Sequence, residues 1–330
     1  MSQPKQHPFD RLSPDMILDA IEAQGFDIDG RVSALNSYEN RVYQIGITDK
    51  EPLIAKFYRP HRWSLLQIQE EHEFSFQLQE HDIPVVTPIK NKQGQSVFNH
   101  SDFKFALFPR KGGHAPELDY QDNLAIMGRT LARVHNVGAE LSYKHRPQLN
   151  AQNFGYHAIS YIEQHFIPFE HRTAYVNTCG EIMAIIEQKL KGANNIRVHG
   201  DLHIGNILMR NDIPYLVDFD DSRSAPAIQD IWMLLSGEPH EQEIQLQKII
   251  AAYAEFRDFP YQELSMIESL RSLRLIHYTA WLAKRWEDPA FPPAFPWFNS
   301  HNFWSQHLLD LQHQLEALNE TTSSVKAMAE

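Results

Sequence analysis

The segment RVHGDLHIGNILMRNDIPYLVDFD, residues 197–220, limits the possible folds of this chain more than any other part of it. Its two glycines argue against a helix, so HGDLHIGN is expected to be a loop. The apolar runs ILM and YLV, joined by the turn-forming RNDIP, predict a β-hairpin. Folding that hairpin places Asn206 beside Asp218 at its open end, with Asp201 on the same loop five residues before Asn206.

This arrangement would bring two carboxylates and an amide oxygen together. Mg²⁺ prefers hard oxygen ligands, so Asn206 and Asp218 are the predicted metal ligands. Asp201 is then free to accept a proton from an incoming hydroxyl. His-x-Asp, Asn five residues later and Asp-Phe twelve residues after that is the catalytic pattern of kinases. The alternatives are a plain turn, or a zinc site at His199 and His203, which would need a helix that the glycines disfavour.

The first third of the chain predicts a small sheet with one main helix. RVYQIGI, PLIAKFY and DFKFALFP are short aromatic and β-branched runs typical of strands. Lys56, in the middle of PLIAKFY, is the predicted phosphate cation, although alone it would more often be an edge-strand charge. The next helix begins with a Ser-x-x-Gln capping box, and on it Glu71 lies on the apolar stripe, where a carboxylate needs a partner. We expect Glu71 to pair with Lys56, and Glu70 and Glu73 to face solvent.

A loop that could cover phosphates precedes these strands. The G-x-G-x-x-G signature is absent, and ALNSYENRVYQIGI occupies its position. There Asn36, Ser37 and Asn40 are turn formers whose side chains can bond to phosphate, with an ordinary hairpin turn as an equal alternative. FKFALFPRKGG predicts the connection between two lobes, where backbone groups around Phe108 are expected to meet an adenine edge.

The change from strand-rich to helix-rich sequence predicts two lobes and an α+β fold. Residues 1–108 would form the N-terminal ATP-binding lobe, with an antiparallel sheet and one main helix. Residues 109–330 would form a larger, mostly helical catalytic lobe. Asp230, at the start of the predicted helix QDIWMLL, is expected to brace the catalytic loop rather than to react.

Composition excludes several classes of partner. A formal net charge of -12 argues against a broad nucleic-acid or anionic-lipid surface. The one cysteine, Cys179, cannot form an intrachain disulfide, and there is neither an apolar signal segment nor a stretch that could span a bilayer. We expect a cytoplasmic protein that binds neither nucleic acid nor membrane.

Several motifs together resemble known families. VHGDLHIGNIL, VDFDD and QDIWMLL resemble the aminoglycoside phosphotransferase and choline kinase-like branch of the protein-kinase fold. LNSYENRVYQ, AKFYRPHRW, EEHEF and RWEDPAFPPAFPWF are similar to the bacterial stress response kinase A (RdoA-type) family. The similarity runs from about Leu35 to Phe298. It implies a bilobal kinase-like fold and an ATP- and Mg²⁺-dependent serine/threonine protein kinase, expected to be a monomer, that phosphorylates itself and other proteins in stress responses.

By motif, the resemblance makes Asp201 the proton acceptor, Asn206 and Asp218 the Mg²⁺ ligands, and Ser37 part of the ATP-contacting loop. The alternative is a small-molecule alcohol kinase of the aminoglycoside, choline or homoserine type. The aromatic residues of RWEDPAFPPAFPWF would then form a cage for a cationic alcohol, although core packing is the favoured interpretation of these residues. A non-catalytic ATP-binding scaffold is disfavoured because Lys56, Asp201, Asn206 and Asp218 are all present.

Overall fold

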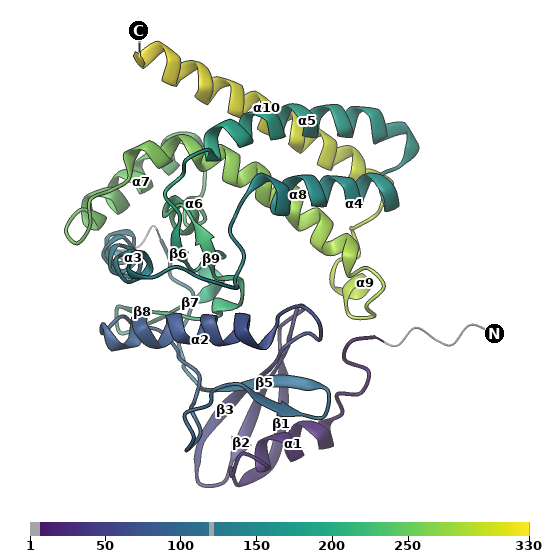
Figure 1. Ribbon diagram of the computed structural model, residues 1–330, viewed down its shortest axis with the longest axis vertical. Coiled ribbons are helices and arrows are strands. Elements are labelled where there is room, and N and C mark those ends of the chain that lie inside the picture. The colour runs from purple at the N-terminus through teal and green to yellow at the C-terminus, as the bar shows by residue number, and fades with distance from the viewer. Residues whose placement is uncertain (1–6, 119–121, 330) are drawn as a thin grey trace. The chain divides into compact units, whose positions relative to one another are not determined.

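The structure, a computed structural model, describes residues 7–118 and 122–329, with side chains described as far as residue 320. The chain forms two compact units, whose elements are labelled in Figure 1. The first unit comprises Met1–Arg146, His199–Ser222 and Met233–Asp258, and the second comprises Pro147–Val198, Arg223–Trp232 and Phe259–Glu330. The predicted N-terminal lobe falls within the first unit, and its boundary at residue 108 stays a prediction.

An antiparallel five-stranded sheet, in the order β1-β2-β3-β5-β4, begins the first unit. Its strands are β1 (Ile28–Leu35), β2 (Arg41–Ile47), β3 (Lys50–Phe57), β4 (Phe98–His100) and β5 (Phe103–Pro109). The three runs predicted as strands are β2, β3 and β5. Because side chains alternate along a strand, one face packs on α1 (Pro14–Glu22) and the other face carries Lys56.

Helix α2 (Leu65–Glu80) packs on the face of the sheet that carries Lys56. It begins with the predicted capping box, in which Ser64 Oγ accepts from the N–H of Gln67 at 3.3 Å and Gln67 Oε1 accepts from the N–H of Ser64 at 2.9 Å. This cap fixes the first turn and thereby the face that the helix buries. Glu71 is on that face and is 3% exposed.

The remaining elements of the first unit are helix α3 and the elements of two later segments, His199–Ser222 and Met233–Asp258. They are α3 (Asn123–Glu140), η2 (Ile204–Asn206), β7 (Ile207–Arg210), β8 (Ile213–Leu216), η3 (Phe219–Asp221) and α7 (Pro239–Tyr253). Helices α3 and α7 approach closely at Gly128, where an added Cβ would lie 2.6 Å from the carbonyl oxygen of Ile249. Any larger residue at Gly128 would push these helices apart.

Strands β7 and β8 form the predicted hairpin. Its two-residue turn, Asn211 and Asp212, has φ values of 51° and 60°, the left-handed conformation that short hairpin turns favour and that Asn and Asp tolerate. The hairpin is anchored in the first unit, since Leu216 accepts a backbone hydrogen bond from Val86 at 3.0 Å. Its open end is therefore held in a fixed place relative to the segment after α2.

The second unit is mostly helical. Its elements are η1 (Gln152–Tyr156), α4 (His157–His165), α5 (Phe169–Leu190), β6 (Ile196–Val198), β9 (Arg223–Ala225), α6 (Ile228–Trp232), η4 (Tyr261–Met266), α8 (Ile267–Lys284), α9 (Phe291–Ala294) and α10 (His301–Ala329). Strand β6 pairs with β9, and α10 packs along α5 (Figure 1). Cys179 is buried on α5.

The aromatic residues of RWEDPAFPPAFPWF lie mainly inside the second unit. Phe291, Phe295 and Phe298 are at most 9% exposed, and they contact Trp281 and Trp304. Core packing, the favoured interpretation, is confirmed for these three side chains, whereas Trp297 is 45% exposed. Across the part of the chain that the structure describes, we find no helix both long enough and apolar enough to cross a bilayer.

Candidate active site

His199 joins the loop before the hairpin to the end of β8. Its buried ring donates from Nε2 to the carbonyl oxygen of Val217 at 2.8 Å and packs against Phe219. Its Nδ1 faces the backbone N–H of Asp201 at 3.4 Å. Both ring nitrogens thus have partners within the loop and hairpin, and this stretch is not helical, so the geometry argues against the zinc alternative.

Asn206 is held between Asp201 and the hairpin. It donates from Nδ2 to the carbonyl oxygen of Asp201 at 2.9 Å, which leaves Oδ1 as its acceptor atom. Its own carbonyl oxygen accepts from the N–H of Val217 at 3.0 Å. Asn206 therefore lies beside the residue that precedes Asp218, as the hairpin predicted.

The carboxylates of Asp201 and Asp218 are both open to solvent, with side chains 25% and 54% exposed. His203 Nε2 lies 3.7 Å from Asp201 Oδ2, and its Nδ1 accepts from the N–H of Gly205. Asp218 has φ 61° and ψ 63°, a left-handed conformation that Asp tolerates better than most residues. This conformation turns the chain from β8 into η3.

The amine of Lys56 meets three carboxylates at the open end of the hairpin. Its Nζ lies 2.8 Å from Asp218 Oδ1, 3.3 Å from Asp220 Oδ1 and 3.6 Å from Glu71 Oε1. Apart from Asp218, these side chains are at most 7% exposed. The structure thus brings Lys56, Glu71 and Asp218 together from three separate elements, and the predicted pairing of Glu71 with Lys56 is confirmed.

Burial and charge act in opposite directions on this cluster. Burial alone would lower the pKa of Lys56, but Asp218, Asp220 and Glu71 outweigh it and hold that pKa well above the ordinary value. Burial raises the pKa of Glu71 to about 7, against the attraction of Lys56. The pKa of Asp220 is lowered, because Arg62 and Lys56 outweigh its burial. Lys56 therefore keeps its charge, whereas burial makes Glu71 harder to ionise.

Arg62 is a residue of the site that sequence analysis missed. Its guanidinium bonds to Asp220 through Nη1 and to Asp221 through Nη2 at 2.9 Å, and its Nε lies 3.6 Å from Glu39 Oε1. The side chain is only 13% exposed. Arg62 thus ties η3 to the loop between β1 and β2. The signal that could have revealed it is the charge complementarity of RPHR after β3 and DFDD after β8.

The loop between β1 and β2 is braced from within. Ser37 Oγ donates to the carbonyl oxygen of Asn40 at 3.1 Å, and Asn40 Oδ1 accepts from the N–H of Arg59 at 3.1 Å. Arg59 also donates from Nε to the carbonyl oxygen of Glu39 at 3.0 Å. Asn36 is exposed and Ser37 half-buried, whereas Asn40 is 3% exposed and supports the loop. Contact of all three predicted residues with a nucleotide stays a prediction.

Arg146 was also missed, and it supports the cluster from behind. Its side chain is fully buried, donates from Nε to the carbonyl oxygen of Ser222 at 2.6 Å and bonds through Nη2 to that of Asp220. Its Nη1 lies 3.5 Å from Glu71 Oε2. Arg146 therefore fixes both the chain after Asp218 and the carboxylate on α2.

The expectation that Glu70 faces solvent was wrong. Its carboxylate accepts backbone N–H bonds from Lys144 and Arg146, both at 2.9 Å. The backbone of residues 144–146 comes close to α2 here and donates its N–H groups to this carboxylate, and sequence spacing cannot reveal that approach. Glu73 is exposed, as predicted.

Two other predicted residues, Phe108 and Asp230, lie on β5 and α6. Phe108 is half-buried on β5, on the same face of the sheet as Lys56, with its ring edge against His72. Asp230 is fully buried in the first turn of α6. The adenine contact near Phe108 and the bracing role of Asp230 stay predictions.

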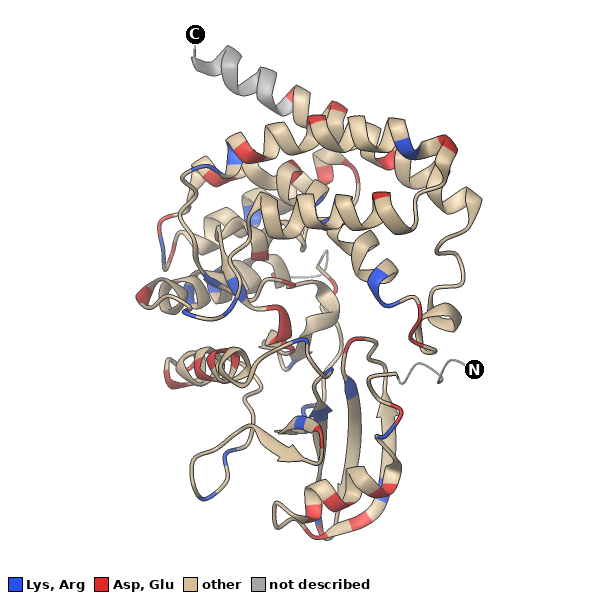
Figure 2. Ribbon diagram, turned by 45° about the vertical axis from the view of Figure 1, so that its right-hand side comes forward, with Lys and Arg blue, Asp and Glu red and all other residues tan. Residues whose placement is uncertain are grey.

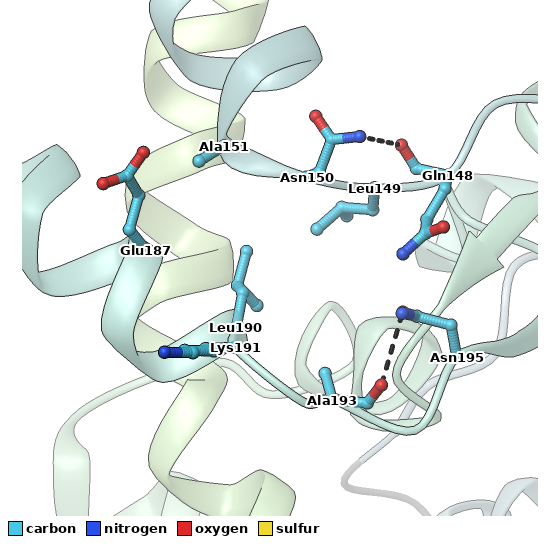
Figure 3. Close-up of a pocket in the computed structure, with 9 residues that line it drawn as sticks. All are labelled: Gln148, Leu149, Asn150, Ala151, Glu187, Leu190, Lys191, Ala193 and Asn195. Carbon is cyan, nitrogen blue, oxygen red and sulfur yellow. Dashed lines mark hydrogen bonds between the residues drawn. The ribbon is translucent and has the colours of Figure 1, made fainter.

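A separate pocket of about 320 Å³ lies in the second unit, between the end of α5 and the segment before η1 (Figure 3). Its amide side chains bond locally: Asn150 donates to the carbonyl oxygen of Gln148, and Asn195 to that of Ala193, each at 3.3 Å. It contains none of the predicted site residues. Acidic and basic residues both occur on α5 and α8, whereas α1 and α2 contain acidic but no basic residues (Figure 2).

Comparison with known proteins identifies the family of the chain. Residues 31–273 match the family described as "Phosphotransferase enzyme family". The chain is 42% identical over 314 residues to "Stress response kinase A" of Escherichia coli O157:H7, covering 94% of this chain and 95% of that protein. It is 40% identical, with the same coverage, to "Serine/threonine protein kinase RdoA" of Salmonella typhimurium strain LT2.

Among solved structures, "Amicoumacin kinase hAmiN in complex with AMP-PNP, Ca2+ and Ami" superposes with a TM-score of 0.72 at 20% identity, covering 94% of both chains. That likeness shows the fold. The chain therefore belongs to the phosphotransferase enzyme family and, within it, to the stress response kinase A family. It is an ATP-dependent phosphotransferase with the predicted kinase-like α+β fold.

Proposed function

We propose that the protein transfers the γ-phosphoryl group of ATP to serine and threonine side chains, its own included, with Mg²⁺, and that it acts in a bacterial stress response. The observation that carries this proposal is the contact of Lys56 Nζ with Asp218 Oδ1 at 2.8 Å, at the mouth of the Asp201–Asn206 loop. The name of the Salmonella relative supports the protein substrate, and the name of the Escherichia coli relative supports the role in a stress response. We further propose a cytoplasmic monomer, on the sequence grounds given above.

Lys56 and the braced loop would bind the nucleotide. Lys56 presents a permanent positive charge, oriented by Glu71, to the phosphates of ATP. The loop at Asn36 and Ser37 lies at the end of β1, and Arg59 and Arg62 hold it in one conformation. A prearranged loop of this kind positions phosphates at small entropic cost.

The donors near the hairpin fit Mg²⁺. Asn206 Oδ1 and the exposed carboxylate of Asp218 are hard oxygen donors, which Mg²⁺ prefers, and they would hold the ion. When bound, the ion neutralises charge on the phosphates. Asp220 contacts Arg62 and Lys56, and these contacts keep η3 in place directly after Asp218.

Asp201 would position the acceptor hydroxyl and take its proton. Its backbone is fixed by Asn206 and His199, and its carboxylate is open to solvent. His203, whose Nδ1 accepts a hydrogen bond from the N–H of Gly205, has its Nε2 3.7 Å from that carboxylate. The transfer of the proton to Asp201 accompanies formation of the bond from the acceptor oxygen to phosphorus.

The substitution Asp201→Asn tests this assignment. We expect phosphoryl transfer to fall at least about 100-fold, because the general base is lost, with nucleotide affinity nearly unchanged. Asp212→Asn, at the far end of the same hairpin, is the matched control, because Asn tolerates the same turn conformation. Transfer from labelled ATP by Asp201→Asn at the wild-type rate would remove Asp201 from this role.

The same assay distinguishes the substrate classes. Labelled ATP is incubated with the purified protein, then with a protein extract and with a pool of small alcohols. Label in the protein and in extract proteins supports the proposal. Label only in an added alcohol would support the small-molecule alternative, and no transfer at all would support a scaffold.

A further inference from the structure

Two histidines and a glutamate converge in the second unit, at the beginnings of α5 and α10. Glu170 and His171 lie in the first turn of α5, and His301 is the first residue of α10. One potential ligand atom from each residue lies within 4.8 Å of the others. Among the residues that the structure describes, this is the only group of three or more His, Cys, Asp or Glu side chains that meets this criterion.

We propose that this cluster binds a divalent transition-metal ion such as zinc. Two imidazoles and one carboxylate form a ligand set that zinc uses when it keeps a fourth position for water. Ligand atoms around tetrahedral zinc lie about 3.4 Å apart, given bonds of roughly 2.0–2.1 Å. His301 Nδ1 is already 3.6 Å from Glu170 Oε1. Small rotations of exposed side chains bring the third ligand into range.

The surroundings favour zinc over Mg²⁺. Imidazole nitrogen suits zinc, copper and nickel, whereas Mg²⁺ requires oxygen ligands, so the site differs in kind from the donors at Asn206 and Asp218. Ser305 Oγ lies 3.3 Å from His171 Nε2, on one side of the ring. A hydrogen bond at one ring nitrogen orients the ring of a histidine whose other nitrogen binds the metal.

A cation at this cluster requires the carboxylate of Glu170. The first turns of two helices present partial positive charge, which by itself repels a cation. Glu170 supplies a full negative charge at this point, and its side chain is 58% exposed and free to turn. Binding of the ion therefore requires Glu170 as well as the two imidazoles.

A bound ion would fasten α10 to α5. These helices pack side by side, and the cluster lies at the beginning of both (Figure 1). A ligand that binds only the folded arrangement raises the stability of that arrangement by mass action. The metal would thus act on the helical unit by holding its last helix in place.

Zinc titration of the full, tag-free chain tests the proposal. The protein is stripped of metal, and calorimetry at pH 7.5 with excess Mg²⁺ measures zinc binding. We expect one equivalent in the wild type. His301→Ala and His171→Ala should each weaken that equivalent at least 10-fold. His313→Ala, exposed on the same helix, is the matched control and should bind as the wild type does.

A second readout separates this site from adventitious binding elsewhere on the chain. At zinc concentrations about 100-fold above the dissociation constant, the melting temperature of the wild type and of His313→Ala should rise by roughly 5 °C. That of His301→Ala should not change. Failure of the wild type to bind zinc, or binding that is equal in all four proteins, would overturn the proposal.

Discussion

Glu71→Gln should stabilise the protein at high pH, although it removes one partner of a buried ion pair. The side chain of Glu71 is 4% exposed, and its Oε1 lies 3.6 Å from Lys56 Nζ, which also contacts Asp218 and Asp220. The carboxylate of Glu71 is therefore the most distant of the three carboxylates that contact the amine of Lys56. Burial raises its pKa from 4.5 to about 7, so ionisation of Glu71 costs stability in the folded state.

The magnitude follows from proton linkage. Between pH 4.5 and 7 the folded protein retains the proton of Glu71 and the unfolded chain does not, so the wild type loses stability as pH rises. Each pH unit in this window is worth about 1.4 kcal/mol, which gives a loss of ~3 kcal/mol by pH 8. Glutamine does not titrate. The variant should therefore gain ~3 kcal/mol relative to the wild type between pH 4.5 and 8.

Urea denaturation of the nucleotide-free and metal-free protein at several pH values between 4.5 and 8 measures this gain. The control is Glu73→Gln, two residues along the same helix and exposed, whose difference from the wild type should not vary with pH. A difference for Glu71→Gln that is constant over the same range would show that Glu71 is ionised throughout, and the argument from burial would be wrong.

Three further variants, at His72 and Arg62, test the surroundings of the cluster. Burial lowers the pKa of His72 to about 3, so the folded protein keeps it neutral while the unfolded chain takes up a proton below pH 6.5. Stability therefore falls by about 2 kcal/mol from pH 7 to 5, and His72→Gln should abolish this component in the same denaturation series. Arg62→Gln should lower the unfolding free energy by roughly 3 kcal/mol, because Asp220 stays buried with one cation fewer. Arg62→Lys should lose less, and thermal unfolding of the two variants checks the order.

Local sequence spacing was enough to predict the β7–β8 hairpin. Turn chemistry and two apolar runs lie within a dozen residues, so pairing places Asn206 next to the chain before Asp218 without knowledge of the rest of the fold. The choice of Glu71 over its neighbours rested on helical periodicity, which is equally local. The capping box of α2 was visible for the same reason.

What sequence reasoning missed depends on segments that meet only in the folded chain. Arg146 reaches Glu71 and Asp220 from 74 or more residues away, and Arg62 reaches Asp220 across 158 residues. Neither arginine has a local pattern that distinguishes it from a solvated cation. Glu70 was misassigned for the same reason, because its partner is the backbone of a distant turn. The charge complementarity of RPHR and DFDD was the one signal in the sequence that could have revealed Arg62.

The chain of 330 residues has a single thiol, on Cys179, and this thiol is unreactive in the folded protein. Burial raises its pKa to about 12, so the reactive thiolate makes up about one part in 10⁵ at neutral pH. Peroxide therefore has no reactive sulfur here to oxidise to a sulfenic acid. An alkylating reagent would modify Cys179 only when the helical unit opens, which makes this residue a built-in reporter of that opening.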